Sequence, residues 1–109
     1  MRIKHSVLVE KIMKEFYEKG FIVKTEIKLP NGKGAVDIVA EKNNLKIYIE
    51  AKSSPQSINS KKVQKQLGRY KESFGEGGVY CLISPNSARQ PKICSLDKKI
   101  NCSLKNYLN

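Results

Sequence analysis

The fold is decided by residues 34–52, which read GAVDIVAEKNNLKIYIEAK. Two runs rich in strand-forming residues, 35–41 and 45–51, are separated by a short polar segment that contains Asn43 and Asn44. Asparagine tolerates the positive φ that a tight turn demands. We therefore predict a β-hairpin with the two asparagines at its tip.

This turn fixes a register that brings charged side chains together. If the asparagines are the two central residues, the numbers of paired residues sum to 87, so Asp37 lies opposite Glu50 and Lys52 follows on the same face. A slip of one residue would turn apolar residues toward Asp37. The opposite face is apolar throughout, as packing against a core requires, and consists of Val36, Ile38, Ala40, Ile47, Ile49 and Ala51.

Two opposed carboxylates and an amine suggest a chemistry. Carboxylates directly opposite each other repel, and a divalent cation would remove that cost because hard cations prefer carboxylate oxygens. Such a cation can polarise a phosphoryl oxygen and activate a water, while Lys52 stabilises developing negative charge. The pattern therefore points to metal-assisted phosphodiester hydrolysis. The alternative is a solvated polar face, which Lys46 and Tyr48 would share.

The remaining chain predicts an α/β fold with a mixed central sheet flanked by helices, in the order α-β-β-β-α-β. The expected elements are a helix over 4–19, strands over 21–28, 35–41 and 45–51, a helix over 60–74 and a strand over 79–83. Beyond Pro85 the pattern weakens, and only a strand near 92–96 and a short terminal piece are suggested.

Composition narrows the class of partner. Lysine and arginine number 21 against 10 acidic residues, giving a net charge of +11, which favours a nucleic acid. The apolar runs are too short to span a bilayer, and the N-terminus lacks the apolar region of a signal peptide. We expect a cytoplasmic protein without a membrane partner, whose three cysteines are free thiols.

The segment from Gly34 to Ala40, followed by Ile49-Glu50-Ala51-Lys52, resembles the PD-(D/E)xK nuclease superfamily. Val36 stands where the family name has proline. The order of elements over residues 4–84 is also that of the family core. The resemblance implies a restriction-endonuclease-like fold, with residues 1–109 as one domain, and a deoxyribonuclease that depends on Mg²⁺ or Mn²⁺.

The resemblance also assigns roles to particular residues. Family members often carry an acid on the first helix that joins the metal shell, and Glu10 is the best candidate here. Gln66 and Tyr70 fit the Gln-x-x-x-Tyr motif of the branch that resembles RecB-type nucleases. The implied catalytic residues are Asp37, Glu50, Lys52, Gln66 and Glu10, and the implied metal ligands are Asp37, Glu50, Glu10 and the main-chain carbonyl of Ala51.

Basic residues near these motifs are candidates for binding DNA phosphates. The candidate DNA-binding residues are Lys33, Lys61, Lys62, Lys65, Arg69 and Tyr70. The alternative is that most of the lysines are simply solvated and that Tyr70 belongs to the core. His5 falls near the apolar side of the first helix, and we expect no catalytic role for it.

Three branches of the superfamily remain open. Archaeal Holliday junction resolvases are compact, basic and dimeric, so this branch implies a homodimer that cuts junctions. RecB-type nucleases imply an end-acting enzyme, and small nuclease modules of viruses and phages are the third branch. Two further alternatives are a catalytically inert DNA-binding module and a nuclease that needs a protein partner. The inert module predicts that Asp37→Ala leaves DNA binding intact and that metal has no effect.

Overall fold

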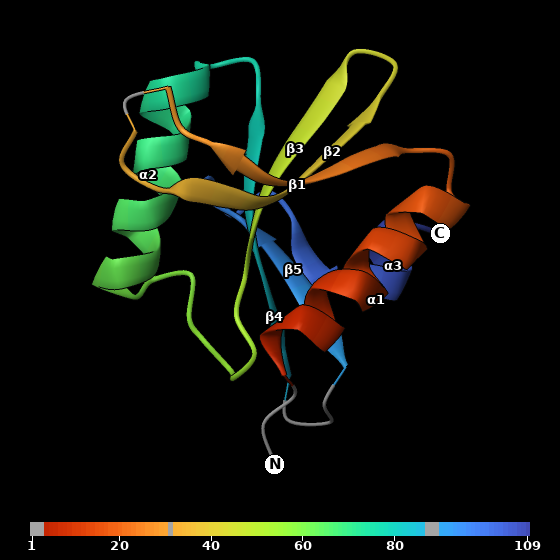
Figure 1. Ribbon diagram of the computed structural model, residues 1–109. Coiled ribbons are helices and arrows are strands. Elements are labelled where there is room, and N and C mark those ends of the chain that lie inside the picture. The colour runs from red at the N-terminus through yellow and green to blue at the C-terminus, as the bar shows by residue number, and fades with distance from the viewer. Residues whose placement is uncertain (1–3, 31, 87–89) are drawn as a thin grey trace.

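The computed structural model describes residues 4–30, 32–86 and 90–109 (Figure 1). Within these ranges the strands form one six-stranded sheet in the order β1-β2-β3-β4-β5-β6. Neighbouring strands are antiparallel except β3 and β4, which are parallel. The elements are α1 (His5–Glu18), β1 (Ile22–Lys28), β2 (Ala35–Lys42), β3 (Leu45–Ala51), α2 (Lys61–Phe74), β4 (Val79–Pro85), β5 (Pro91–Ser95), β6 (Asn101–Ser103) and α3 (Leu104–Tyr107).

The predicted fold class is confirmed, and the six elements expected up to residue 83 are present. Their ends agree to within one residue, apart from β4, which continues to Pro85. The suggested strand near 92–96 is β5, and the terminal piece is β6 followed by the short helix α3. No helix in the described part of the chain is long and apolar enough to cross a membrane.

Helix α1 ends where its glycine permits a sharp turn. Gly20 has φ 88°, a conformation that costs a residue without Cβ little. Its amide donates to the Tyr17 carbonyl at 3.0 Å, and the Phe21 amide donates to the Phe16 carbonyl at 3.1 Å. These two bonds are those of a Schellman motif, and they direct the chain from the helix into β1.

The β2–β3 hairpin has the predicted register. The pairs run from Lys42 with Leu45 to Ile38 with Ile49, and each pair of numbers sums to 87. Asn43 takes a positive φ of 56°, as the turn requires.

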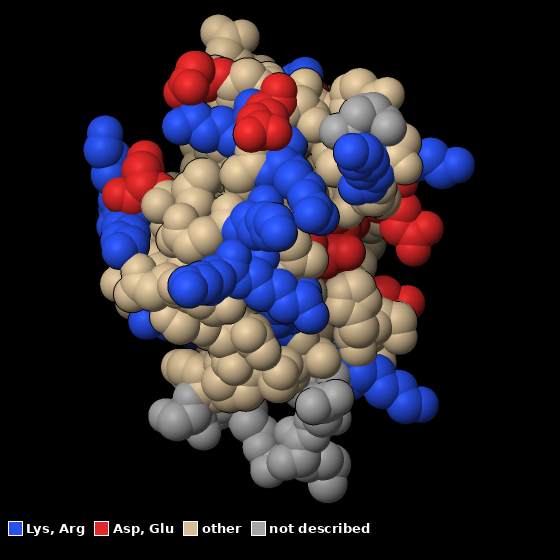
Figure 2. All heavy atoms as spheres, turned by 90° about the vertical axis from the view of Figure 1, so that its left-hand side faces the viewer, with Lys and Arg blue, Asp and Glu red and all other residues tan. Residues whose placement is uncertain are grey.

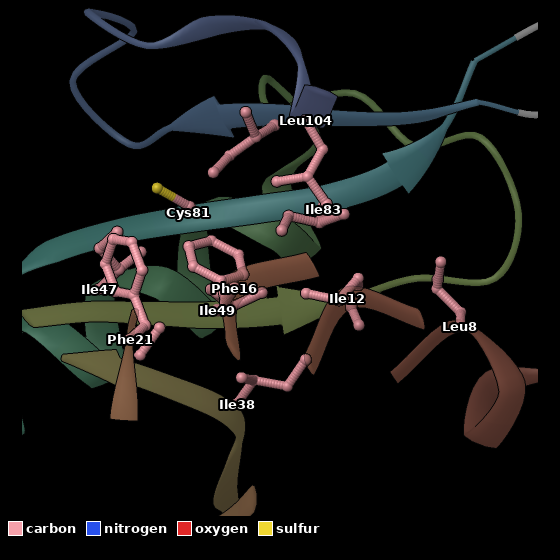
Figure 3. Packing of buried hydrophobic residues seen from close by; sticks show 13 residues of the cluster. Leu8, Ile12, Phe16, Phe21, Ile38, Ile47, Ile49, Cys81, Ile83 and Leu104 are labelled. Carbon is pink, nitrogen blue, oxygen red and sulfur yellow. The ribbon is translucent and has the colours of Figure 1, made fainter. Parts of the chain in front are cut away.

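The sheet separates two apolar clusters. Helices α1 and α3 cover one face, and α2 covers the other (Figure 1). On the first face, side chains of α1 and α3 pack on the central strands (Figure 3), and the cluster includes Leu8, Ile12, Phe16, Ile38, Ile47, Ile49, Cys81, Ile83 and Leu104. On the second face, α2 packs its buried stripe on the sheet, and the cluster includes Val36, Tyr48, Val63, Leu67, Tyr70 and Leu82.

One side chain does not follow the predicted alternation. We expected Val36 to share a face with Ile38 and Ala40, but it is buried in the cluster beneath α2, whereas Ile38 and Ala40 belong to the cluster beneath α1. The regular alternation of β2 is therefore interrupted between Val36 and Ile38. The residue at the interruption is Asp37.

Candidate active site

Asp37 lies where the sheet departs from regular geometry. The pairing of β2 with β3 is regular up to Ile38 and Ile49. Asp37 and Glu50, which we predicted to lie directly opposite each other, are not among the paired residues of β2 and β3. Instead, the Ala51 amide donates to the Asp37 Oδ2 at 2.9 Å. On the other side of β2, Glu26 of β1 falls opposite Asp37 in the register and has a positive φ of 50°. Positive φ is uncommon for residues other than glycine and marks a local distortion of the strand.

Glu50 is a buried carboxylate held from two directions. Its side chain lies on the same face as α2 and is 6 % exposed. The Lys52 Nζ lies 3.0 Å from Oε2, and the Tyr70 hydroxyl donates a short hydrogen bond to Oε1. The Tyr70 hydroxyl also lies 3.3 Å from the Ala35 carbonyl oxygen. Helix α2 therefore orients Glu50 through Tyr70.

The environment of Glu50 raises the pKa of its carboxyl group above the usual value. Burial is the largest cause, and the nearby negative charge of Asp37 raises the pKa further. The Tyr70 hydrogen bond and Lys52 act in the opposite direction and lower this pKa. Burial and the Glu50 carboxylate also raise the pKa of Tyr70, so its hydroxyl stays protonated and remains a donor.

Two pockets meet at Asp37. The one on the α2 side has a volume of about 270 Å³ and is lined by Asp37, Glu50 and Tyr70, together with Leu29, Lys33, Gly34, Ala35, Gln66 and Arg69. Within the described part of the chain, the buried Gln66 Oε1 has no hydrogen-bond partner. Because a buried unpaired acceptor is costly, this oxygen is suited to meeting a donor from a water or ligand that enters the pocket.

The second pocket opens on the α1 side and has a volume of about 300 Å³. It is lined by Asp37 and Glu10, together with His5, Ser6, Val9, Met13, Thr25 and Glu26. The His5 Nε2 lies 3.1 Å from the Ala51 carbonyl oxygen and 3.4 Å from the Asp37 Oδ2. Glu10 is exposed in this pocket. Asp37 is the side chain that both pockets share.

The place of His5 differs from the one expected, on the apolar side of the first helix. His5 lies on the same side of α1 as Leu8 and Ile12. However, it is the first residue of the helix and lies beyond the end of the core. Its side chain is consequently about half exposed and reaches Asp37. The available signal was its position one turn before the apolar stripe, at the helix end nearest the carboxylates.

The residues at Asp37 fit a divalent metal through oxygen atoms. No group of three or more His, Cys, Asp or Glu side chains that could hold a metal occurs among the described residues. A metal here would therefore be held by two carboxylates, from Asp37 and Glu50, and by the Ala51 carbonyl, with water completing the shell. Oxygen ligands of this kind suit Mg²⁺, which keeps several waters. Burial, and to a smaller extent the charge of Asp37, raise the pKa of Glu50 because they disfavour its carboxylate, and a bound cation would offset both effects.

Positive side chains lie on the face of α2 that points to solvent. Lys61, Lys62, Lys65 and Arg69 are exposed there, and lysine and arginine gather over this side of the molecule (Figure 2). Lys33 and Arg69 also line the pocket that contains Glu50. Tyr70, which we expected among the DNA-binding residues, is instead buried with its hydroxyl on Glu50.

The fold and this arrangement of acids and lysine define a restriction-endonuclease-like nuclease domain. A family model described as a restriction endonuclease, Mrr_cat, matches residues 5–89. The chain belongs to this family, and the predicted membership of the PD-(D/E)xK nucleases is confirmed. The comparison with curated proteins finds no match.

The structure is also similar to that of Hjc, a Holliday junction resolvase from Archaeoglobus fulgidus. The two share a TM-score of 0.65 and 15 % sequence identity, and the alignment covers 97 % of this chain and 87 % of that one. At this identity the similarity establishes a common fold. The relation to RecB-type nucleases stays a prediction.

Proposed function

We propose that this protein hydrolyses phosphodiester bonds of DNA with the help of a divalent metal ion, Mg²⁺ or Mn²⁺. The observation that carries the proposal is the meeting of Asp37, Glu50 and Lys52 at the irregular end of the β2–β3 pairing, with the Lys52 Nζ 3.0 Å from Glu50. Membership of a restriction endonuclease family supports a nuclease, and the net charge of +11 supports a polyanionic substrate.

Asp37, Glu50 and the Ala51 carbonyl are the groups that would hold the metal. When bound, it would polarise a phosphoryl oxygen and lower the pKa of the attacking water. Glu10 faces the same Asp37 from the α1 side and is the candidate for a contribution through water. Gln66, whose buried oxygen faces no partner among the described residues, would accept a hydrogen bond from a water in the pocket.

The chain's own charged groups would stabilise the transition state. The Lys52 ammonium lies beside the carboxylate and would donate to a phosphate oxygen as negative charge develops there. Tyr70 fixes the Glu50 carboxylate from the other side, so the geometry is set before substrate arrives. Lys33 and Arg69 would hold neighbouring phosphates at the pocket, and Lys61, Lys62 and Lys65 would extend the contact along α2.

Branched DNA is the substrate we propose. The similarity to Hjc extends over 97 % of the chain, and Hjc is a Holliday junction resolvase. Resolving a four-way junction requires two cuts related by the symmetry of the junction. We therefore propose a homodimer with two-fold symmetry, the commonest arrangement of soluble oligomers, with one site for each cut.

The test compares labelled linear duplex, single strands and four-way junctions, each with Mg²⁺, Mn²⁺ or EDTA. The variant Asp37→Asn keeps the size of the side chain and removes its charge. We expect cleavage that needs metal and is lost in the variant, with the junction cut fastest. Lys105→Ala, an exposed change on α3, serves as the control and should cleave at the wild-type rate.

Three results would contradict the proposal as stated. Binding of DNA by both proteins without any cleavage would favour a catalytically inert module, and cleavage restored by an added protein would favour a partner-activated nuclease. Cleavage that is equally fast in EDTA would exclude the metal, whatever the substrate.

A further inference from the structure

A third pocket lies on the same face of the sheet as Glu50. Its volume is about 230 Å³. The segment between β3 and α2 contributes Gln56, Ser57, Ile58 and Asn59, and the sheet contributes Leu82, Ser84, Lys92, Cys94 and Asn101. None of these residues belongs to the candidate active site.

The strand register connects this pocket to the candidate active site. Glu50 of β3 pairs with Leu82 of β4, Leu82 pairs with Cys94 of β5, and Cys94 pairs with Asn101 of β6. Directly paired residues point to the same face, so these four side chains form a row across the sheet. Strands are spaced by about 4.8 Å, so Cys94 lies about 10 Å from Glu50 along this row and Asn101 about 14 Å.

The chemistry of the lining suits the edge of a nucleobase. Gln56, Asn59 and Asn101 each offer an amide that both donates and accepts hydrogen bonds. Leu82 and Cys94 are buried and give the pocket an apolar floor. None of the described lining residues is acidic, and Lys92 supplies a positive charge for a phosphate.

The size of the pocket favours a single unpaired base. At about 230 Å³ it lies below the range of about 300–1,000 Å³ that is usual for small-molecule and cofactor sites. A base inside a duplex keeps its pairing edge hidden, whereas an unpaired base can be turned into a pocket and recognised along that edge. The amides of this pocket have the donors and acceptors that the exposed edge of such a turned base would need.

We propose that this pocket, with Gln56, Asn59 and Asn101 as its amides and Lys92 on its phosphate, binds an unpaired nucleotide of the DNA strand whose scissile phosphate lies at Glu50. The proposal rests on the proposed nuclease function for the identity of that strand. The separation of about 10–14 Å places the bound base a few nucleotides from the scissile phosphate along the strand. The protein would then select DNA that has unpaired bases at this distance from the cut.

The test uses full-length protein and a labelled duplex with a single-stranded extension of about ten nucleotides, which fixes the register. A single abasic site is moved along the extension, and binding is measured by fluorescence anisotropy in EDTA. We expect one position at which the missing base weakens binding by roughly five- to hundredfold, the range of a well-made base contact. In Asn101→Ala this dependence should vanish, so that intact and abasic DNA bind equally.

Two matched variants separate base recognition from general effects. Asn106→Ala, an exposed amide on α3, should keep the wild-type dependence. Lys92→Ala should weaken binding of intact and abasic DNA by the same factor, because a phosphate contact is indifferent to the base.

The outcomes distinguish the pocket from the nuclease. Binding that is insensitive to an abasic site at every position would overturn the pocket proposal, as would a dependence that survives Asn101→Ala. Because binding in EDTA needs no catalysis, a protein that never cleaves can still show the dependence. A protein that cleaves DNA but binds it equally well with an abasic site at any position would support the nuclease proposal and contradict the pocket proposal.

Discussion

The hydrogen bond from Tyr70 to Glu50 gives a prediction that needs no knowledge of the substrate. Tyr70→Phe removes the hydroxyl and keeps the ring, so the packing of α2 on the sheet is preserved. A hydrogen bond to a charged group contributes about 1.5–3 kcal/mol. Because Glu50 is buried, water would not replace the donor that its carboxylate loses. We expect the free energy of unfolding at pH 8 to fall by about 1.5–3 kcal/mol.

The same substitution should have a smaller effect in acid. The Tyr70 bond lowers the pKa of Glu50, so its removal raises that pKa further and favours the protonated carboxyl. At pH 4 the substitution removes a hydrogen bond to the protonated, neutral Glu50 carboxyl, which should lower the free energy of unfolding by about 1 kcal/mol. Tyr80→Phe is the matched control, because the Tyr80 hydroxyl donates to the uncharged Gly75 carbonyl at 2.6 Å. The loss of unfolding free energy in Tyr80→Phe should be the same at both pH values.

Urea unfolding followed by circular dichroism, without metal, measures both effects. With a slope of about 1.5 kcal/mol per M, the midpoint of Tyr70→Phe should fall by roughly 1–2 M at pH 8. A midpoint for Tyr70→Phe within about 0.3 M of wild type at pH 8, or an equally large loss of stability at pH 4, would contradict this role of the Tyr70 hydrogen bond.

Three further predictions concern charge, packing and DNA binding. The native state binds the Glu50 proton more tightly than the unfolded state does, because the native pKa is raised. The free energy of unfolding should therefore fall as pH rises from 4.5 through the native pKa of Glu50. Urea unfolding at a series of pH values should show this fall in wild type and not in Glu50→Gln. Gly78→Ala would place a Cβ 2.7 Å from the Tyr48 ring and should cost about 1–3 kcal/mol in thermal unfolding. Gly77→Ala meets nothing within 4 Å and should leave the melting temperature unchanged. Lys65→Ala should reduce the slope of log affinity against log salt by about one unit, and an unchanged slope would remove Lys65 from the DNA contact.

The hairpin was predictable because its information is local. Alternation with period two and a turn of two asparagines define both the pairing and the face of each side chain, and five pairs have the predicted register. The distortion at Asp37 was not predictable from these signals. It involves the positive φ of Glu26 in a different strand, and the apolar pattern of β2 continues through Val36 without a sign of it.

The candidate site was predictable where it depends on the hairpin and not where it depends on the helices. The hairpin brings Asp37 and Glu50 near each other, although its regular pairing ends at Ile38 and Ile49. Tyr70 reaches Glu50 only because α2 crosses the sheet above β3 and β4. The position of Tyr70 in the apolar stripe indicated burial but not its partner. The contact of His5 with Asp37 likewise depends on how far α1 extends past its core.

The strands after Pro85 show the weakest link between sequence and structure. Strands β5 and β6 are short, and β6 contains no continuous apolar run to mark it. Strand β5 pairs along the edge of β4, and β6 pairs in turn along the edge of β5. The pocket that contains Asn101 therefore emerges only from the three-dimensional arrangement.

The catalytic centre is tested directly by the single-turnover rate of junction cleavage by Lys52→Ala at saturating protein and Mg²⁺. Lys105→Ala serves as the control for loss of one positive charge. Removing a group that stabilises transition-state charge costs about 10²–10³ in rate. We predict a loss of this size in Lys52→Ala, with DNA affinity changed no more than in the control. Cleavage by Lys52→Ala at the control rate would contradict the assignment of the catalytic centre to Asp37, Glu50 and Lys52.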